Sequence, residues 1–186
     1  MKELRIKNMV CDRCKKVIND ELTNLGVEVY TVELGVIKID PKSIELETIA
    51  KAIKTHGFEL IETKEEILVE RIKVFLIYIT NKLPVHRKTK LSTMISGELG
   101  RDYSSLSKIF SQHEHLTIEK YFLRLKLEKV KELIQDGSHS FSHIASILDY
   151  SSINHLSSQF KQETGFSMSD YKTMLQPNRK PLDKIV

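Results

Sequence analysis

The sequence contains the same pattern of side chains twice, at a spacing of about fifty residues. Internal similarity at a fixed spacing indicates that one small structural unit has been duplicated, and this constrains the fold more than any other feature of the chain. The matching residues of the two copies are Leu106, Ser107, Phe110, Thr117 and Tyr121, and then Leu156, Ser157, Phe160, Ser167 and Tyr171. Upstream, Ile95 and Leu99 correspond to Ile144 and Leu148.

The second copy indicates what kind of unit is repeated. A short apolar helix pattern ends at Leu148-Asp149-Tyr150, and a second helix pattern begins at Ser151. The apolar residues of the two patterns have a spacing that closes a small core, which predicts a helix-turn-helix. In the first copy, Gly100-Arg101-Asp102 suggests a longer turn than Asp149 alone provides.

A longer helical pattern lies between the two copies. Residues 117–135 carry apolar side chains at roughly helical spacing, and Asp136-Gly137 then supplies a stop signal. We therefore expect two helix-turn-helix units joined by one long helix. This all-α part is predicted to span residues 64–178, with residues 179–186 as a C-terminal tail.

This arrangement resembles the DNA-binding domain of the AraC/XylS family, in which two such units present two recognition helices to neighbouring turns of the major groove. The resemblance covers about Ile67 to Leu175, with I-A-x-x-L, Y-S-S, F-K-x-E-T-G-F and Tyr171 in register. Asp149 stands where the family usually has glycine, and Asp tolerates the left-handed conformation better than most residues. Met168 stands where the family usually has proline, which removes pre-organisation without forbidding the helix.

The second helix of each unit supplies the candidate DNA contacts. Short polar side chains on an exposed helix face suit the base edges of a major groove, so the expected partner is double-stranded DNA. Asn154 is the best candidate for a base contact because an amide can pair bidentately with adenine, whereas the others can contact phosphates or water instead. The candidates are Ser104, Ser105, Ser107 and Lys108 in the first recognition helix, and Ser152, Asn154, His155, Ser158 and Lys161 in the second.

The distribution of charge agrees with this assignment. Residues 1–63 hold ten Lys plus Arg against eleven Asp plus Glu, whereas the remainder holds nineteen against fourteen. The positive charge therefore belongs to the helical half, where it can contact phosphates. The basic run around residues 86–90 suits either phosphate contacts or an ordinary solvated surface.

The N-terminal half carries a separate signal, Met9-Val10-Cys11-Asp12-Arg13-Cys14. Around this loop the sequence predicts strand, helix, strand, strand, helix and strand, which is the split βαβ order. The expected fold class is therefore α+β, with a ferredoxin-like βαββαβ domain over residues 1–63 before the all-α domain. The expected elements are residues 2–7, 15–26, 27–33, 36–40, 43–55 and 58–61.

With M-x-C-x-x-C in its first loop, this half resembles a heavy-metal-associated domain. That resemblance implies that Cys11 and Cys14 bind Cu(I) or another soft metal ion, and thiolates do prefer such ions. Two alternatives remain open, namely a dithiol switch and a fold retained for protein or ligand contacts. Met9 is expected in the core, and His56 is expected to be a loop or core residue rather than a ligand.

Together these features indicate a sequence-specific transcriptional regulator that responds to a thiophilic metal. The alternative is a metallochaperone-like or thiol-redox module with a helical protein-docking domain. No Gly-rich phosphate loop, nucleophile elbow or paired-carboxylate arrangement stands out, so we do not expect an enzyme. No apolar run approaches the roughly 20 residues needed to span a bilayer, so we expect a cytoplasmic protein without membrane contact, as a monomer or a homodimer.

Overall fold

The computed structural model describes residues 1–42, 45–85, 89–174 and 179–185. The chain divides into two compact units, Met1–Val74 and Phe75–Val186. The boundary falls within helix α3 (Lys64–Asn81), whereas the domains predicted from the sequence meet where α3 begins. Several predicted features lie outside the described residues, namely the expected helix start at 43–44, the basic residues 86–88, the end of the helical domain at 175–178, and residue 186.

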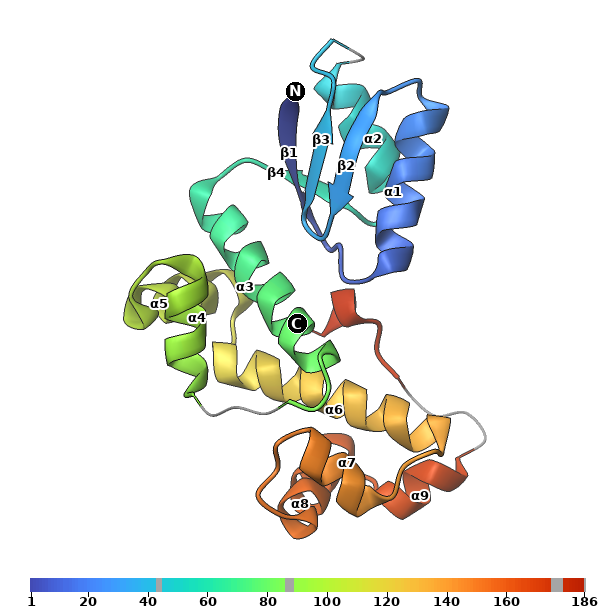
Figure 1. The fold of residues 1–186 in the computed structure, drawn as a ribbon, viewed down its shortest axis with the longest axis vertical. Helices are drawn as coiled ribbons and strands as arrows, with labels where there is room; N and C mark the ends of the chain where they lie inside the picture. The colour runs from blue at the N-terminus through green and yellow to red at the C-terminus, as the bar shows by residue number, and fades with distance from the viewer. Residues whose placement is uncertain (43–44, 86–88, 175–178, 186) are drawn as a thin grey trace. The chain divides into compact units, whose positions relative to one another are not determined.

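The first unit contains a four-stranded sheet with two helices, in the order expected from the sequence. The strand order is β2-β3-β1-β4, and each neighbouring pair is antiparallel. Figure 1 shows α1 and α2 next to each other on one side of this sheet. The elements are β1 (Lys2–Lys7), α1 (Asp12–Asn24), β2 (Val29–Glu33), β3 (Val36–Ile39), α2 (Leu46–Lys54) and β4 (Glu59–Ile61).

Alternating apolar residues of the strands form the core of this unit. Leu4 and Ile6 of β1 and Ile37 and Ile39 of β3 are buried, because residues two apart along a strand face the same side of the sheet. They form one hydrophobic cluster with buried residues of both helices, which are Ile18, Leu22, Ile49 and Ile53. Met9 is fully buried in the same cluster, as expected.

The first part of α3 also belongs to this unit. The backbone N–H of Asn8 donates to Glu70 Oε1 at 3.0 Å, and the Glu70 side chain is buried. A Cβ added at Gly35 would lie 3.5 Å from Val74 Cγ2, and Gly35 has φ of +77°, a conformation that L side chains rarely adopt. The turn between β2 and β3 is therefore held against α3, a contact that no sequence pattern indicates.

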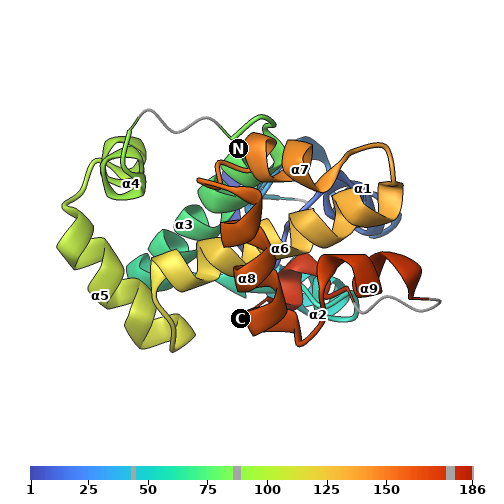
Figure 2. The same ribbon diagram turned by 90° about the horizontal axis from the view of Figure 1, so that it is seen from below.

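The second unit contains the two predicted helix-turn-helix units, α4–α5 and α7–α8. Helix α6 connects them, as Figures 1 and 2 show. After α9, a short 3₁₀ helix lies in the C-terminal tail. The elements are α4 (Leu91–Leu99), α5 (Tyr103–Glu114), α6 (Ile118–Asp136), α7 (Phe141–Ile147), α8 (Ile153–Thr164), α9 (Met168–Thr173) and η1 (Leu182–Lys184).

The sequence repeat is also a structural repeat. The rings of Phe110 and Tyr121 have centroids 5.6 Å apart, and those of Phe160 and Tyr171 are 5.4 Å apart. All four side chains are almost completely buried. Each aromatic pair therefore joins the second helix of a helix-turn-helix unit to the helix that follows it, at the same position of the two copies.

The helix starts are repeated as well. Asp102 and Ser152, fifty residues apart, are the N-caps of α5 and α8, and their side chains accept hydrogen bonds from the backbone N–H groups of Ser105 and His155. Thr117 caps α6 and Ser167 caps α9 in the same way. Because a capping oxygen satisfies a backbone donor that the helix leaves unpaired, these residues fix where each helix begins.

The turn of the second helix-turn-helix unit is longer than that of the first, which is the opposite of our expectation. Gly100 (φ 63°) and Asp149 (φ 57°) both adopt the left-handed conformation, so the prediction for Asp149 is confirmed. However, Asp102 caps α5 two residues after Gly100, whereas Ser152 caps α8 three residues after Asp149. The expectation of a longer first turn is wrong, because Tyr150 and Ser151 both precede the second cap.

We expect opposite effects from two substitutions of Asp149. Asp149→Gly should raise the free energy of unfolding by up to about 1 kcal/mol, because glycine adopts positive φ without steric cost. Asp149→Val should lower it by about 1–3 kcal/mol, because a β-branched residue is strained there. Urea denaturation followed by circular dichroism measures both, with Asp20→Val on the exposed face of α1 as the control. Equal losses for the two valine variants would contradict the expectation.

Candidate nucleic-acid interface

Helix α8 presents a polar face opposite its buried side. Leu156 and Phe160 are fully buried and define the inner face. Asn154, Ser158 and Lys161 are spaced at i, i+4 and i+7 and are all exposed, so they share the opposite face. Within the described part of the chain, the side-chain amide of Asn154 makes no hydrogen bond, so its donor and acceptor are both available.

Helix α5 presents the corresponding face of the first unit. Ser104 and Lys108 occupy the positions of Asn154 and Ser158 in the repeat, and both are exposed, as is Ser105. Ser107 is partly buried, on the flank of the helix. The structure therefore leaves Ser104, Ser105 and Lys108 more accessible to a partner than Ser107.

Two of the candidate serines already have structural roles. The Oγ of Ser152 accepts the backbone N–H of His155 at 3.0 Å. The hydroxyl of Ser104 donates to the carboxylate of Asp102, and this hydrogen bond, with that of the Ser105 backbone N–H, lowers the pKa of Asp102. Ser152 and Ser104 thus help to start α8 and α5, which leaves less of their hydrogen-bonding capacity for a partner.

His155 is held by side chains that the sequence analysis did not single out. Its Nδ1 lies 3.0 Å from the hydroxyl of Ser151, and its ring meets the ring of Tyr150 edge to face, with centroids 5.5 Å apart. On α6, Lys126 places its Nζ 3.8 Å from the centroid of the Tyr150 ring. The sequence indicates Tyr150 and Ser151 only as residues of the turn. Lys126 is too distant in sequence for any spacing to suggest its contact with the Tyr150 ring.

The C-terminal tail lies along α6 within the second unit. Arg124, Glu128 and Glu132 follow one another at i, i+4 and i+8 and therefore share one face of α6. The tail contacts each in turn. Arg124 Nη1 donates to the carbonyl oxygen of Ile185 at 3.0 Å. The backbone N–H of Lys180 donates to Glu128 Oε2 at 3.0 Å. Arg179 Nη2 donates to Glu132 Oε2 at 3.1 Å.

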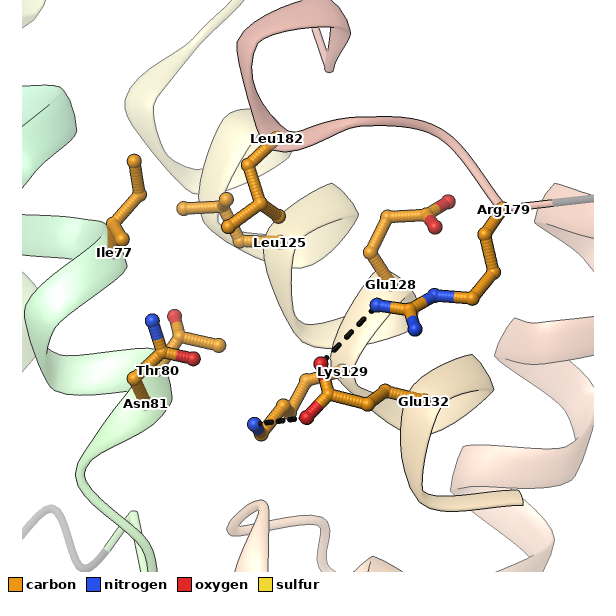
Figure 3. Close-up of a pocket in the computed structure, with 9 residues that line it drawn as sticks. All are labelled: Ile77, Thr80, Asn81, Leu125, Glu128, Lys129, Glu132, Arg179 and Leu182. Carbon is orange, nitrogen blue, oxygen red and sulfur yellow. Dashed lines mark hydrogen bonds and ion pairs between the residues drawn. The ribbon is translucent and has the colours of Figure 1, made fainter. Parts of the chain in front are cut away.

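A small pocket lies beside this tail. Figure 3 shows it between Leu182 of the tail, Leu125 of α6 and Ile77 of α3, with the ion pairs of Glu132 at one side. The side chain of Ile185 is almost completely buried. Polar and apolar contacts together therefore fix the tail on α6.

The two thiols of the first unit lie close together at the start of α1. Cys11 is the N-cap of this helix, and its Sγ is 3.4 Å from the Sγ of Cys14. Both are free and partly buried, and burial raises the pKa of the Cys14 thiol. His56 is exposed and pairs with Glu21 at 3.1 Å. Two sulfurs at this separation can converge on one soft ion or be oxidised to a disulfide.

A metal ion at this loop would rely on these two sulfurs. No group of three or more His, Cys, Asp or Glu side chains that could hold an ion is found among the described residues. Two thiolates are a donor set that suits a soft ion such as Cu(I) rather than a hard cation such as Mg²⁺. In the same described residues, no helix has both the length and the apolar character required to cross a membrane.

The second unit thus contains two helix-turn-helix units in register, joined by α6. Residues 95–174 match the sequence family described as "Helix-turn-helix domain". The similar proteins include the HTH-type transcriptional activator RhaS of Escherichia fergusonii, with 35% identity over 63 residues, and that of Salmonella arizonae, with 32% identity over 68 residues. These matches cover 34% and 37% of this chain but 23% and 24% of the relatives.

Solved structures show the same fold. A transcriptional regulator with an AraC-type DNA-binding domain from Chromobacterium violaceum is 18% identical, with a TM-score of 0.50, over 60% of this chain and 96% of that one. The C-terminal domain of AraT from Geobacillus stearothermophilus is 18% identical, with a TM-score of 0.51, over 63% and 95%. The RhaS relatives are named HTH-type transcriptional activators. This chain spans about a quarter of their length.

Proposed function

We propose that this protein is a sequence-specific DNA-binding transcriptional regulator of the AraC type. The observation that carries the proposal is the structural repeat, which gives α5, before α6 in the chain, and α8, after it, equivalent exposed polar faces. Similarity to proteins named transcriptional activators supports it. The side chains that would face DNA from α5 are Ser104, Ser105, Ser107 and Lys108. Those that would face DNA from α8 or its N-cap are Ser152, Asn154, His155, Ser158 and Lys161.

The two kinds of contact can be separated by substitution. Asn154→Ala should lower discrimination at the contacted base by roughly 1–3 kcal/mol, because an amide pairs bidentately with adenine. Lys108→Ala should instead weaken binding to all sequences more evenly, because a phosphate contact carries no sequence information. Selection from a random DNA library measures both effects. An unchanged consensus for Asn154→Ala would remove this residue from the base contacts.

The duplication also predicts the form of the DNA site. If both recognition helices enter the major groove of one duplex, the site should contain two half-elements about 10 base pairs apart, even for a monomer. Footprinting on the selected site tests this expectation, and the stoichiometry of the complex shows how many chains bind. Protection of a single half-element by the whole chain would contradict it.

For the first unit, we propose a ferredoxin-like domain of the heavy-metal-associated type that binds Cu(I) or another soft ion through Cys11 and Cys14. The short separation of the two sulfurs and the order of strands and helices support this proposal. A sensor further requires that the ion bind the DNA-competent and DNA-incompetent states unequally, because an ion bound equally by both shifts nothing. Helix α3 is the covalent route for such a signal, since its residues are divided between the two units.

The same thiol geometry also favours a second candidate, a thiol-redox module. Two free sulfurs 3.4 Å apart need to approach by about 1.3 Å to reach a disulfide length of roughly 2.05 Å. If the first unit is a thiol-redox module or a metallochaperone, the helical unit would dock on a protein. Absence of sequence-selective DNA binding would support these alternatives over the regulator.

A further inference from the structure

His155 is exposed on α8, yet it has neighbours that restrict its ring. The hydroxyl of Ser151 lies 3.0 Å from Nδ1, and Tyr150 covers the ring edge to face. Tyr150 is itself fixed, because its side chain is buried and Lys126 lies over its ring at 3.8 Å. Such a cation–π contact is strongest where water is excluded, and Lys126 is only 6% exposed.

We propose that Tyr150, Ser151 and Lys126 are positioning residues that hold His155 in one orientation and one tautomer, with Nε2–H directed to an acceptor on DNA. This inference rests on the proposed function of the second unit. In this proposal the hydroxyl of Ser151 is the donor and Nδ1 is the acceptor of the 3.0 Å contact, which places the imidazole proton on Nε2. The opposite nitrogen then serves as a hydrogen-bond donor at the start of the recognition helix.

The chemistry of the acceptor follows from this tautomer. An N–H donor pairs with a major-groove acceptor, which is N7 of a purine, O6 of guanine or O4 of thymine, or with a phosphate oxygen. It does not pair with the exocyclic amino groups of adenine or cytosine, which are themselves donors. Substitution of 7-deazapurines in the selected site removes the N7 acceptors, and a methylphosphonate removes the phosphate charge, so a contact with purine N7 and a contact with phosphate can be distinguished.

The tautomer can be tested without DNA. Two-bond ¹H–¹⁵N NMR of the full-length, ¹⁵N-labelled protein at neutral pH should show His155 with its proton on Nε2. Ser151→Ala should produce a mixture of the two tautomers, and Ser151→Thr should restore the single form, since threonine keeps the hydroxyl. The same tautomer ratio in the wild type and in Ser151→Ala would overturn the role of Ser151.

The role of Tyr150 has its own matched pair of variants. Tyr150→Phe keeps the ring and removes a buried hydroxyl that has no hydrogen-bond partner among the described residues. This variant should preserve the NMR signals of His155 and the DNA affinity. Tyr150→Leu keeps an apolar side chain but removes the ring, so it should broaden or shift the imidazole signals. Wild-type signals in Tyr150→Leu would overturn the positioning role of the ring.

A double-mutant cycle with DNA completes the test. Ser151→Ala should weaken binding to the selected site about three- to tenfold, as expected for loss of one well-placed hydrogen bond. In a His155→Ala background the same change should have almost no effect, because contacting residues are not additive. Equal losses in both backgrounds would overturn the proposal. If the wild type selects no DNA sequence, the proposed function fails together with the DNA-facing role, whereas the NMR result still decides the tautomer.

Discussion

Phe160→Ala is expected to lower the free energy of unfolding of the second unit by about 3–5 kcal/mol. Phe160 is fully buried, and its ring packs edge to face on Tyr171, with centroids 5.4 Å apart. The substitution removes this apolar area and leaves a cavity between α8 and α9. Because domains are stable by only about 5–15 kcal/mol, this loss is a large fraction of the total.

The chain offers a matched control for this experiment. Phe166 lies six residues further along and is 46% exposed, so Phe166→Ala should change stability by no more than about 0.5 kcal/mol. Urea denaturation of both variants, followed by circular dichroism, gives the difference. Hydrogen exchange should locate the weakened amides in α8 and α9. Similar losses for the two phenylalanines would show that the packing of Phe160 is not what stabilises this unit.

Replacing Cys11 and Cys14 with serine is expected to abolish uptake of a soft metal ion by the first unit. The reduced wild type should bind about one Cu(I) per chain, because its two sulfurs are close enough to share one ion. A serine hydroxyl is a poor replacement, since it scarcely ionises and is a harder ligand than a thiolate. Competition with a Cu(I) chelator under anaerobic conditions measures the affinity.

The pH dependence gives an independent check of the same site. Burial raises the pKa of the Cys14 thiol, so binding at neutral pH must displace a proton from sulfur. The apparent affinity for Cu(I) should therefore increase as the pH rises towards the ordinary thiol range. The His56→Ala variant is the control, because His56 pairs with Glu21 and should leave uptake unchanged. Metal binding that survives in the double serine variant would place the ion elsewhere.

DNA affinity at fixed salt then separates a sensor from a simple metal-binding domain. A change between apo and Cu(I)-loaded protein that disappears in the double serine variant would establish the sensor. Tight Cu(I) binding with unchanged DNA affinity would reject the sensor proposal while keeping the metal site.

Much of the second unit could be predicted from the sequence because its signals are local. The repeat located both helix-turn-helix units, and the apolar spacing located Leu156 and Phe160 in the core. The left-handed conformation of Asp149 could also be predicted, because Asp tolerates positive φ better than most residue types. The length of the second turn was misjudged, because the N-cap at Ser152 competes with Ser151 as a starting point and both are serines.

The remaining features depend on residues that are distant in sequence. The contact of Asn8 with Glu70 spans 62 residues, and that of Arg124 with Ile185 spans 61. Neither contact changes the helical or strand periodicity of the segments involved, so a pattern in one segment cannot identify its partner. The environment of His155 is also set partly by a distant residue, because Lys126 of α6 lies over the ring of Tyr150, which packs on His155.

The tail on α6 has a consequence for how the salt dependence of DNA binding is interpreted. The slope of log affinity against log salt concentration ordinarily counts released counterions and hence phosphate contacts. Here the Arg179–Glu132 pair is exposed enough to be screened over the same concentration range. If the tail supports α6 when DNA is bound, part of the measured slope arises within the protein. The slope of log affinity against log salt concentration for Glu132→Gln would then be shallower than that of the wild type, although a carboxylate cannot neutralise a phosphate.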